Sequence, residues 1–600
     1  MQSPSRLAWL FSAILLFVVA FGLLPRQQAK GTAAVIGWDV AGYYLYLPAT
    51  FIHHDLRDLK FHEQMMRDYA PTPNFEQQAF VCAPTGHYVL KYPAGMAVHY
   101  LPFFLAAHAL AAPLGYAADG YSPPYQMAIL LGSVLAAIAG LWLVRRALRP
   151  RFGEWPTALT LLAIVLGTNY INYTAIAGAM SHNWLFGWYA ALLLLTPAFY
   201  ERPGRGRALA IGAIIGLMAL TRPTDILAVV LVLGWGLRPD GATLRGRLAF
   251  WQRHWPLLLL ALLAGAAVLS IQPLYWHYVS GHWIINSYQE QGFDWLKPHL
   301  WDGIFSFKGG WLLYSPLVVV ALAGFAALRR QQPAAFWPML VFMVVFTYVA
   351  FAWKEWLYGG SLGQRAMIQT YAVLAWPLAA AHRWLLTRRV WLVAYAVFAA
   401  LTCYYSLWLT YQAHRGGLLV VGQMTRAYWW RILGRYEVPA EARLALDTNY
   451  DFTGTPRNTQ VIWQEDFETP TDSSACARPP LAGRCSLLLD AAHPSSREYV
   501  IPARRGQFRW VRGSALASSS DYEYQEGHYT QFVVKFCQGD KVLRERTVQY
   551  QRVLQPGVPQ QLSFYIKAPS ADFDHLKVVF LHHGTASMLF DNASLTAFDD

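Results

Sequence analysis

The chain has 600 residues, of which 55% are hydrophobic, 15% aromatic and only 14% charged, and its formal net charge is +13. This apolar, charge-poor composition excludes an ordinary soluble globular protein and indicates a polytopic α-helical membrane protein. The basic residues fall in short clusters between apolar runs rather than in one stripe or tail, so they are interpreted as topology signals, and nucleic acid is not an expected partner.

The basic clusters set the expected order of the membrane spans. The first apolar run, Leu7 to Leu24, is longer than the apolar region of a signal peptide and lacks a small-x-small cleavage site, so we expect it to be retained. Because positive clusters favour the cytoplasmic side, the runs between successive clusters must come in pairs. The clusters are Arg145, Arg146, Arg149 and Arg151; Arg202, Arg205 and Arg207; Arg238, Arg245, Arg247 and Arg253; Arg329 and Arg330; and Arg383, Arg388 and Arg389.

One apolar run conflicts with this pairing. If both Ala94 to Leu114 and Tyr125 to Val144 crossed, the cluster that starts at Arg145 would lie outside. We therefore expect Ala94 to Leu114 to lie on or dip into the outer face, and we expect about eleven spans in a bacterial inner membrane, with the N-terminus in the cytoplasm. The later spans are about Pro156 to Leu166, His182 to Phe199, Ala208 to Leu220, Ile226 to Gly236, Pro256 to Tyr275, Trp311 to Leu328, Phe336 to Phe351, Ala366 to Ala381 and Val390 to Tyr411.

Asp39 is the first acidic residue after the first span. It lies in the stretch Gly37 to Tyr44, within an expected outer loop of residues 26–124 that contains surface helices. A carboxylate just outside the far face is a candidate catalytic group, and the nearby Tyr43 is a candidate substrate-binding residue. The alternative is that Asp39 caps a helix that begins at Val40.

Arg222 lies between two short apolar runs that leave only five residues for the turn, so the turn should sit below the outer surface. An arginine at that depth costs about 2.5 to 3.5 kcal/mol unless it faces a cavity or a counter-ion. Arg222 is therefore a candidate anion ligand, and the alternative is a structural ion pair with Asp225. His182, which starts a span on the outer side, is a candidate neighbour of this site or an interfacial polar residue.

A second large outer loop covers residues 276–310 and is rich in Trp, Tyr, His and Gly. Long loops inside compact proteins tend to be functional, and aromatic faces suit sugar rings, so acceptor binding is one interpretation of this loop, with Glu290 as a candidate contact. An aromatic belt at the membrane interface would give the same composition.

The pattern changes after about Pro439, where long apolar runs give way to short alternating segments. This predicts a linker over residues 416–440 and a periplasmic antiparallel β-sandwich over residues 441–600, large enough to bury its own core. In an oxidising compartment, a disulfide between Cys476 and Cys485 is plausible, whereas Cys82 and Cys537 are either free or paired with each other. The alternating segments include Gln531 to Phe536, Gln561 to Ile566 and Leu576 to Leu581.

Three motifs in residues 1–415 resemble the GT-C superfamily of membrane glycosyltransferases, especially the branch with protein O-mannosyltransferases and aminoarabinose transferases. Asp39 stands in Trp-Asp-x-x-x-Tyr, Lys91-Tyr92-Pro93 is similar to the Lys-Pro-Pro that opens a surface helix in that branch, and Trp356 to Arg365 resembles Trp-x-x-Gly-x-Ser-Phe-Gly-x-Arg. The chain departs from the pattern at Tyr92 and at Leu362. It also has one early acid rather than a pair, so a divalent metal is not indicated, although it stays an alternative, and no cofactor is predicted.

The resemblance implies transfer of a sugar from a polyprenyl-phosphate donor to a glycan, lipid or protein acceptor at the outer face, with inversion. A carboxylate must then remove the acceptor hydroxyl proton, and cations must stabilise the leaving phosphate. Asp39 would be the base, while Lys91, Arg222 and Arg365 would hold the phosphate. Trp356 is a further candidate substrate-binding residue.

Two segments of the β domain resemble the first and last strands of carbohydrate-binding jelly-roll modules, whose paired ends sometimes hold calcium. These segments are Trp463 to Glu468 and Ser587 to Leu595. Glu465, Asp466 and Asp591 would supply the hard oxygen ligands that this ion prefers.

Two non-enzymatic functions remain as alternatives to a glycosyltransferase. The first is a transporter or flippase of lipid-linked glycans, although such proteins usually contain internal repeats, and the sequence shows none. The second is a polysaccharide-assembly scaffold, for which this many spans would be a large anchor.

Overall fold

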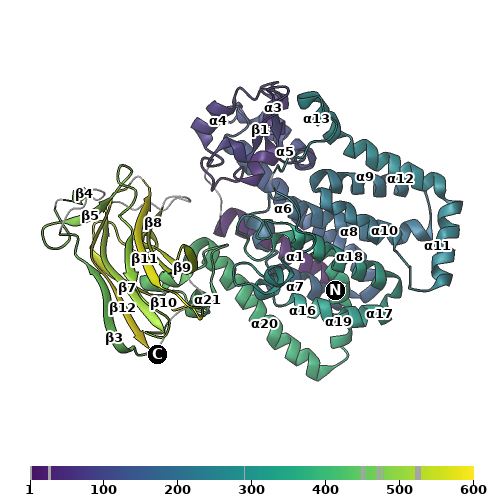
Figure 1. Ribbon diagram of the computed structural model, residues 1–600. Coiled ribbons are helices and arrows are strands. Elements are labelled where there is room, and N and C mark those ends of the chain that lie inside the picture. The colour runs from purple at the N-terminus through teal and green to yellow at the C-terminus, as the bar shows by residue number, and fades with distance from the viewer. Residues whose placement is uncertain are drawn as a thin grey trace. The chain divides into compact units, whose positions relative to one another are not determined.

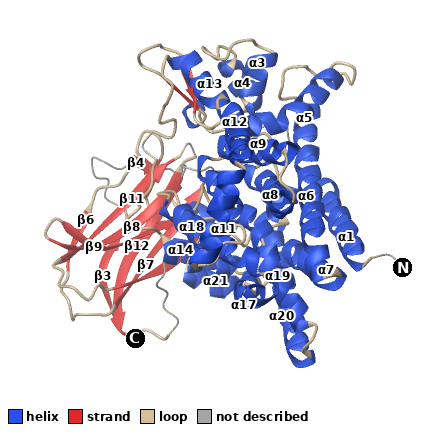
Figure 2. Cartoon of the chain, turned by 90° about the vertical axis from the view of Figure 1, so that its right-hand side faces the viewer, coloured by secondary structure: helices blue, strands red, loops and turns tan. Residues whose placement is uncertain are grey.

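The computed structural model describes residues 3–24, 29–289, 291–447, 452, 454–468, 475–477, 479–520, 529–584 and 586–599. The chain divides into two compact units, Met1–Arg415 and Gly416–Asp600. Figure 1 shows that the first unit is built mainly of helices and the second mainly of strands, and Figure 2 shows the same division by colour. An α-helical unit followed by antiparallel sheets is the coarse architecture that the sequence predicts.

The first unit is a bundle of helices joined by short turns and two larger loops. A small hairpin of β1 (Ala79–Val81) and β2 (Tyr88–Leu90) lies in the first loop. The helices are α1 (Pro4–Val18), α2 (Asp39–Tyr44), α3 (Tyr46–Phe51), α4 (His62–Tyr69), α5 (Gly95–Ala111), α6 (Pro123–Phe152), α7 (Glu154–Gly167), α8 (Ser181–Glu201), α9 (Arg205–Thr221), α10 (Val229–Leu233), α11 (Gly241–Arg253), α12 (Trp255–Leu269), α13 (Ile271–Ser280), α14 (Leu300–Phe305), α15 (Trp311–Tyr314), α16 (Val318–Ala323), α17 (Phe325–Gln331), α18 (Pro333–Ala352), α19 (Tyr371–Leu385) and α20 (Arg389–Tyr411), with the short helical turns η1 (Val19–Leu23), η2 (Phe75–Gln77), η3 (Asn172–Ile176), η4 (Pro223–Ala228), η5 (Arg365–Thr370) and η6 (Gln412–Gly416).

Five helices of the described residues are long and apolar enough to cross a membrane. One of them includes α12, on which no residue is buried although it is almost wholly apolar. A helix with its apolar surface exposed in this way is stable only against lipid or another protein. The five segments are Pro4–Leu23, Pro123–Phe152, Trp255–Ser280, Pro333–Ala352 and Arg389–Gly416.

Several expected spans are shorter or interrupted, and the breaks follow from proline and glycine. The expected span Trp311 to Leu328 is three short helices, α15, α16 and α17. Pro316 follows the end of α15, where a helix cannot continue normally. Gly324 joins α16 to α17, where an added Cβ would lie 2.1 Å from the carbonyl oxygen of Pro377 on α19. Close helix contact therefore determines this break.

The expected outer loop at residues 276–310 also differs from the prediction. Helix α13 continues to Ser280, so the loop begins later than Trp276, and it contains α14. The expected span Ile226 to Gly236 is formed by the 3₁₀ turn η4 and the short helix α10. Helix α5, the expected surface helix, is one of the shorter apolar helices and contains Pro102.

Small residues allow α9 and α12 to approach closely, and Figure 1 shows the two helices side by side. Gly212 and Gly216 lie one turn apart on α9. A Cβ at Gly212 would lie 1.9 Å from the carbonyl oxygen of Ala261, and one at Gly216 would lie 2.4 Å from that of Gly265. This small-x-x-x-small arrangement is typical of helices that pack backbone to backbone within a membrane.

Gly212→Ala should therefore destabilise the helical unit by about 1 to 3 kcal/mol, because the added methyl group overpacks a backbone contact. Thermal unfolding of the purified protein in detergent measures this change. Gly206→Ala is the matched control on the same helix, because no atom lies within 4 Å of its added Cβ. An equal melting temperature for the two variants would contradict the close-packing account.

The second unit is a sandwich of two antiparallel sheets. One sheet has six strands in the order β10-β7-β12-β5-β4, with β3 pairing with β12, and the other has four in the order β6-β11-β8-β9. Phe532 on β8 packs against Phe564 on β10, and Phe580 on β11 packs against Phe590 on β12, so one core joins the sheets. The strands are β3 (Arg457–Glu465), β4 (Ala475–Ala477), β5 (Ser486–Leu489), β6 (Tyr499–Pro502), β7 (Trp510–Ser519), β8 (Tyr529–Gln538), β9 (Lys541–Gln549), β10 (Gln560–Lys567), β11 (His575–His583) and β12 (Met588–Asp599).

The segment that precedes the sandwich is ordered rather than a bare linker. It contains α21 (Arg426–Ile432) and the 3₁₀ helix η7 (Ala440–Asp447). The carboxylate of Asp447 accepts a hydrogen bond from the backbone N–H of Gln549 and pairs with Arg552. Arg546 donates to the carbonyl oxygen of Leu444 at 3.2 Å. These contacts fix η7 against the end of β9.

Candidate functional site

Asp39 lies at the start of α2 and forms two strong side-chain contacts. Its carboxylate accepts a hydrogen bond from Arg365 Nη2 at 2.6 Å and another from the Tyr92 hydroxyl at 2.7 Å. Helix α2 begins at Asp39 itself, and its N-cap residue Trp38 makes no side-chain capping bond. The alternative in which Asp39 caps the helix is therefore wrong. Trp38 has a φ of 52°, which is a strained conformation for a bulky residue. The backbone therefore turns sharply directly before Asp39, where α2 begins.

Lys91 follows strand β2, and its backbone N–H donates to the carbonyl oxygen of Gln78. Its Nζ lies 5.6 Å from the ring centre of Tyr92 and 5.7 Å from that of Tyr288. Burial lowers the pKa of Lys91, while the charges of Asp39 and Glu355 act in the opposite direction. Lys91 therefore lies within electrostatic reach of Asp39, between two aromatic rings.

Proline and glycine place Arg222 at the same site. The residue before a proline favours extended backbone, so Pro223 ends α9 at Thr221 and leaves Arg222 extended, with φ −146° and ψ 117°. The N-terminal turn of α5 lies against this break, since a Cβ added to Gly95 would lie 2.4 Å from the Thr221 backbone. This contact places the start of α5, which follows the Lys91 segment, against the end of α9 from which Arg222 leaves.

Arg222 makes contacts on several sides. Its guanidinium carbon lies 5.5 Å from the ring centre of Tyr358. Its Nε lies 3.8 Å from a carboxylate oxygen of Asp225, and its Nη1 lies 3.0 and 3.2 Å from the two ring nitrogens of His182. The ion pair with Asp225, which the sequence left as an alternative, is present.

Arg365 begins the 3₁₀ helix η5, after a loop that contains residues in left-handed conformation. Tyr358 has a φ of 51°, and Gly363 has a φ of 68°. At Gly363 a Cβ would lie 2.8 Å from the Cβ of Tyr314, so this close turn requires glycine. The loop therefore places the Tyr358 ring against the Arg222 guanidinium and places Arg365 within hydrogen-bonding distance of Asp39.

Tyr43 lies among these charges, on the same short helix as Asp39. Burial raises the pKa of Tyr43 to about 12, Asp39 adds to that increase, and Arg365 and Arg222 oppose it. The structure thus brings together six of the residues that the sequence predicts for the site. The side chains of Asp39 and Arg365 are 24% and 19% exposed, so a substrate can reach them. The six residues are Asp39, Tyr43, Lys91, His182, Arg222 and Arg365.

Of the two remaining candidate substrate-binding residues, one lies away from Asp39 and the other lies outside the described residues. Trp356 stacks on His299, with ring centres 6.1 Å apart, in the late loop, and no contact joins it to Asp39 among the described residues. Glu290 lies outside the described residues. Tyr92, whose hydroxyl bonds to Asp39, is not among the predicted site residues. The signal for it is that Tyr92 is the position at which the Lys91 motif departs from the pattern it resembles.

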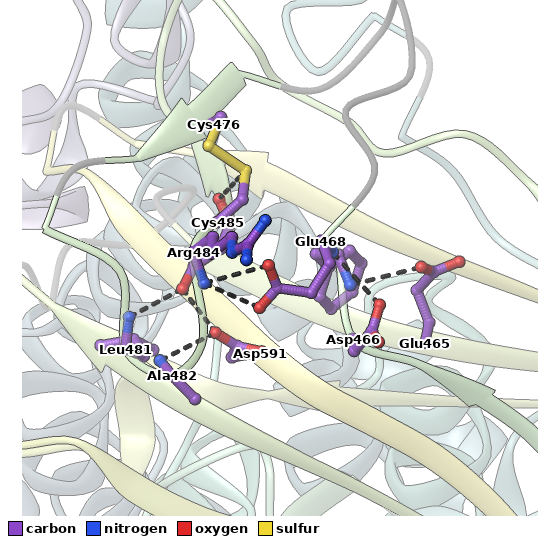
Figure 3. The surroundings of a disulfide bond; sticks show 11 residues. Glu465, Asp466, Glu468, Cys476, Leu481, Ala482, Arg484, Cys485 and Asp591 are labelled. Carbon is purple, nitrogen blue, oxygen red and sulfur yellow. Dashed lines mark hydrogen bonds between the residues drawn. A yellow bond between two sulfur atoms is a disulfide. The ribbon is translucent and has the colours of Figure 1, made fainter.

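The three calcium candidates of the β domain are engaged in other contacts, and Figure 3 shows the positions of Glu465, Asp466 and Asp591. Glu465 pairs with Arg497 at 3.0 Å, and Asp466 accepts a hydrogen bond from the backbone N–H of Glu468. Asp591 is buried and accepts hydrogen bonds from the Ala482 N–H, the Ser486 hydroxyl and its neighbour's N–H. These carboxylates contact protein groups here, and the calcium site stays a prediction.

Nearby, Cys476 and Cys485 form the disulfide that the sequence makes plausible, whereas Cys82 and Cys537 are free. Across the described ranges, no group of three or more His, Cys, Asp or Glu residues could hold a metal ion. At the site itself the carboxylate of Asp39 is paired with a guanidinium, so the donor set suits an anionic substrate better than a divalent cation.

Several solved structures resemble the chain. The oligosaccharyltransferase of Archaeoglobus fulgidus is 14% identical, with 72% of this chain and 58% of that chain covered and a TM-score of 0.41. The arabinosyltransferase EmbB of Mycobacterium smegmatis is 13% identical (83% and 60% covered, TM-score 0.34). ArnT of Cupriavidus metallidurans, bound to undecaprenyl phosphate, is 16% identical (63% and 70% covered, TM-score 0.32).

These neighbours are GT-C glycosyltransferases, the class that the sequence motifs resemble. The chain covers less than two thirds of the length of the oligosaccharyltransferase. No protein-family model matches the chain, and no curated protein does. TM-scores below 0.5 at such low identity leave the function of this chain to be inferred from the site itself.

Tyr92→Phe should lower activity without unfolding the protein, because it removes one of the two hydrogen bonds that hold the Asp39 carboxylate in position. A hydrogen bond to a charged group contributes roughly 1.5 to 3 kcal/mol, so kcat/KM for the reaction proposed below should fall about 10- to 100-fold. Tyr69→Phe is the matched control, since the Tyr69 hydroxyl donates to Asp119, outside the site. Equal rates for the two variants would contradict a role for Tyr92.

Proposed function

We propose that this protein is a glycosyltransferase that moves a sugar from a polyprenyl-phosphate-linked donor to a glycan, lipid or protein acceptor at the periplasmic face of a bacterial inner membrane. The observation that supports it is the convergence of one carboxylate, Asp39, with Lys91, Arg222 and Arg365. A carboxylate can take a proton from a hydroxyl, and cations can bind a phosphate, so one cluster supplies both needs of this reaction.

In the proposed reaction an acceptor hydroxyl attacks the anomeric carbon of the donor. Asp39 takes the hydroxyl proton, the new glycosidic bond forms, and the bond from the anomeric carbon to the phosphate oxygen breaks, with its electron pair leaving on the polyprenyl phosphate. A direct displacement of this kind inverts the anomeric configuration. Arg365 and Arg222 would bind the phosphate through planar guanidinium groups, and Lys91 would add a point charge.

The ion pair between Asp39 and Arg365 has a consequence for the order of events. Arg365 Nη2 lies 2.6 Å from the Asp39 carboxylate, so the carboxylate is engaged by a cation. A donor phosphate would compete for Arg365, and the transfer of this guanidinium to the phosphate would leave Asp39 a stronger base. Donor binding is therefore proposed to precede the activation of the acceptor.

Asp39→Asn should abolish sugar transfer, because an amide cannot accept the hydroxyl proton but keeps the size of the side chain. We expect a loss of at least about 100-fold in kcat, in line with typical contributions of general base catalysis. The measurement is turnover of a polyprenyl-phosphate sugar by the purified protein in liposomes. Unchanged turnover would remove Asp39 as the base.

The same variant separates the enzyme from the transporter alternative, which the interrupted helices near Arg222 also fit. A flippase moves its lipid-linked cargo without breaking the sugar–phosphate bond. Wild-type protein that moves a fluorescent lipid-linked glycan across liposomes, with no release of polyprenyl phosphate, would favour the transporter. Release of polyprenyl phosphate that depends on Asp39 favours the enzyme.

The proposed orientation places the first loop outside and the basic clusters inside, and cysteine labelling tests it. In a background in which Cys82 is replaced by serine, Ala118→Cys in the exposed turn after α5 should react with a membrane-impermeant thiol reagent in intact spheroplasts. Ala242→Cys, exposed on α11 beside the basic cluster, is the matched control and should react only after lysis. Labelling in the reverse order would contradict the proposed topology.

A further inference from the structure

Four buried polar side chains next to Arg222 are linked by hydrogen bonds, and they have no role in the proposed reaction. The 3₁₀ turn η4 carries Asp225, η5 carries Gln369, and α8 carries His182 and Tyr189. Asp225, Gln369 and Tyr189 are fully buried, and His182 is 2% exposed. Buried polar groups of this kind are costly unless they are hydrogen-bonded, so their bonding pattern is informative.

The chemistry of each group fixes the direction of these hydrogen bonds. An ionised carboxylate only accepts, so Asp225 accepts from the Tyr189 hydroxyl at 2.8 Å and from Gln369 Nε2, which lies 3.3 Å from both carboxylate oxygens. The amide oxygen of Gln369 is then an acceptor, and it lies 2.8 Å from His182 Nδ1. His182 therefore carries its proton on Nδ1.

The tautomer of His182 sets its contact with Arg222. Arg222 Nη1 lies 3.0 Å from Nδ1 and 3.2 Å from Nε2. With the proton on Nδ1, only Nε2 has a free lone pair, so Nε2 is the nitrogen that can accept from Arg222. Asp225 also attracts Arg222 directly, with Nε 3.8 Å away. Nη1 of the guanidinium thus contacts His182 and Nε lies near Asp225, whereas Nη2 takes part in neither contact.

We propose that Asp225 is a positioning residue that acts through Gln369 and His182 to hold the Arg222 guanidinium with its remaining edge toward the donor phosphate. His182 is then a neutral link between Gln369 and Arg222 rather than a substrate ligand, which revises its expected role. Because Arg365 and Gln369 both lie on η5, the same short helix also carries the second phosphate ligand. The proposal rests on the proposed function, since it assigns the orientation of a phosphate-binding arginine.

The hydrogen-bond direction gives a specific test. In Asp225→Asn the side-chain oxygen can still accept from Tyr189 and Gln369, but the NH₂ group replaces the carboxylate oxygen that faces Gln369 Nε2 and Arg222 Nε. The negative charge that orders Gln369 and attracts Arg222 is then lost, so the contact of His182 with Arg222 should weaken. In the double variant Asp225→Asn/Gln369→Glu the new carboxylate accepts from both neighbours, so His182 keeps its proton on Nδ1 and the contact with Arg222 returns.

The measurement is the Kd of undecaprenyl phosphate for the full-length protein in lipid nanodiscs, which needs no acceptor. Asp225→Asn should raise this Kd about tenfold, the loss expected for one hydrogen bond to a charged group. Asp225→Asn/Gln369→Glu should bring it back to within about threefold of the wild-type value. A purely structural role for Asp225 would not be rescued by placing the negative charge on residue 369.

Two further variants keep the test decisive. If Asp225→Asn does not fold, Gln369→Met interrupts these hydrogen bonds while leaving Asp225 intact, and it should raise the Kd by a similar factor. Asp119→Asn is the matched control, because this carboxylate accepts hydrogen bonds from the backbone N–H groups of Tyr121 and Ser122 in the first loop and contacts none of these residues. Its Kd should equal the wild-type value.

The outcomes separate this proposal from the function on which it rests. No binding of undecaprenyl phosphate by the wild-type protein would overturn the proposed function. Binding that weakens in Arg222→Ala, but not in Asp225→Asn or Gln369→Met, would overturn the positioning role alone. Failure of the double variant to recover binding, with its folding intact, would also overturn it.

Discussion

The ion pair between Asp39 and Arg365 is the contact on which the arrangement of the helical unit depends. It joins residues 326 positions apart in the chain, and both are mostly buried. A charge in such surroundings is costly without a partner, so the first loop and the late loop must both be in place for either residue to be stable. The hydrogen bond from Tyr92 adds the segment that carries Lys91 to the same contact.

Proline and glycine do more than interrupt helices in this unit. Pro223 ends α9 so that Arg222 leaves the helix in extended conformation, and Gly95 lets α5 approach that same end. The break behind Arg222 continues into η4, whose Asp225 meets Gln369 and Tyr189 below the surface. The break between α9 and η4 thus places the residues that contact Arg222 at the site.

The departures from the related motifs are as informative as the matches. The motif that Lys91-Tyr92-Pro93 resembles has proline at the position of Tyr92, and here the tyrosine hydroxyl bonds to Asp39. This chain therefore stabilises its single early carboxylate with a phenol and a guanidinium.

The β-sandwich follows its expected pattern more simply, since the first and last strands, β3 and β12, pair directly. Two of its three calcium candidates contact protein groups, since Glu465 pairs with Arg497 and Asp591 accepts three hydrogen bonds.

The sequence by itself determined the class of protein and the short list of site residues. Apolar runs and basic clusters predict helices in a membrane, alternation predicts strands, and the motifs single out Asp39, Lys91 and Arg365, because these signals are local. Only the tertiary structure decided how side chains converge: that Asp39 bonds Arg365 instead of capping its helix, and that His182 links Arg222 to Gln369. Such contacts depend on packing between helices distant in sequence, and no local pattern contains that information.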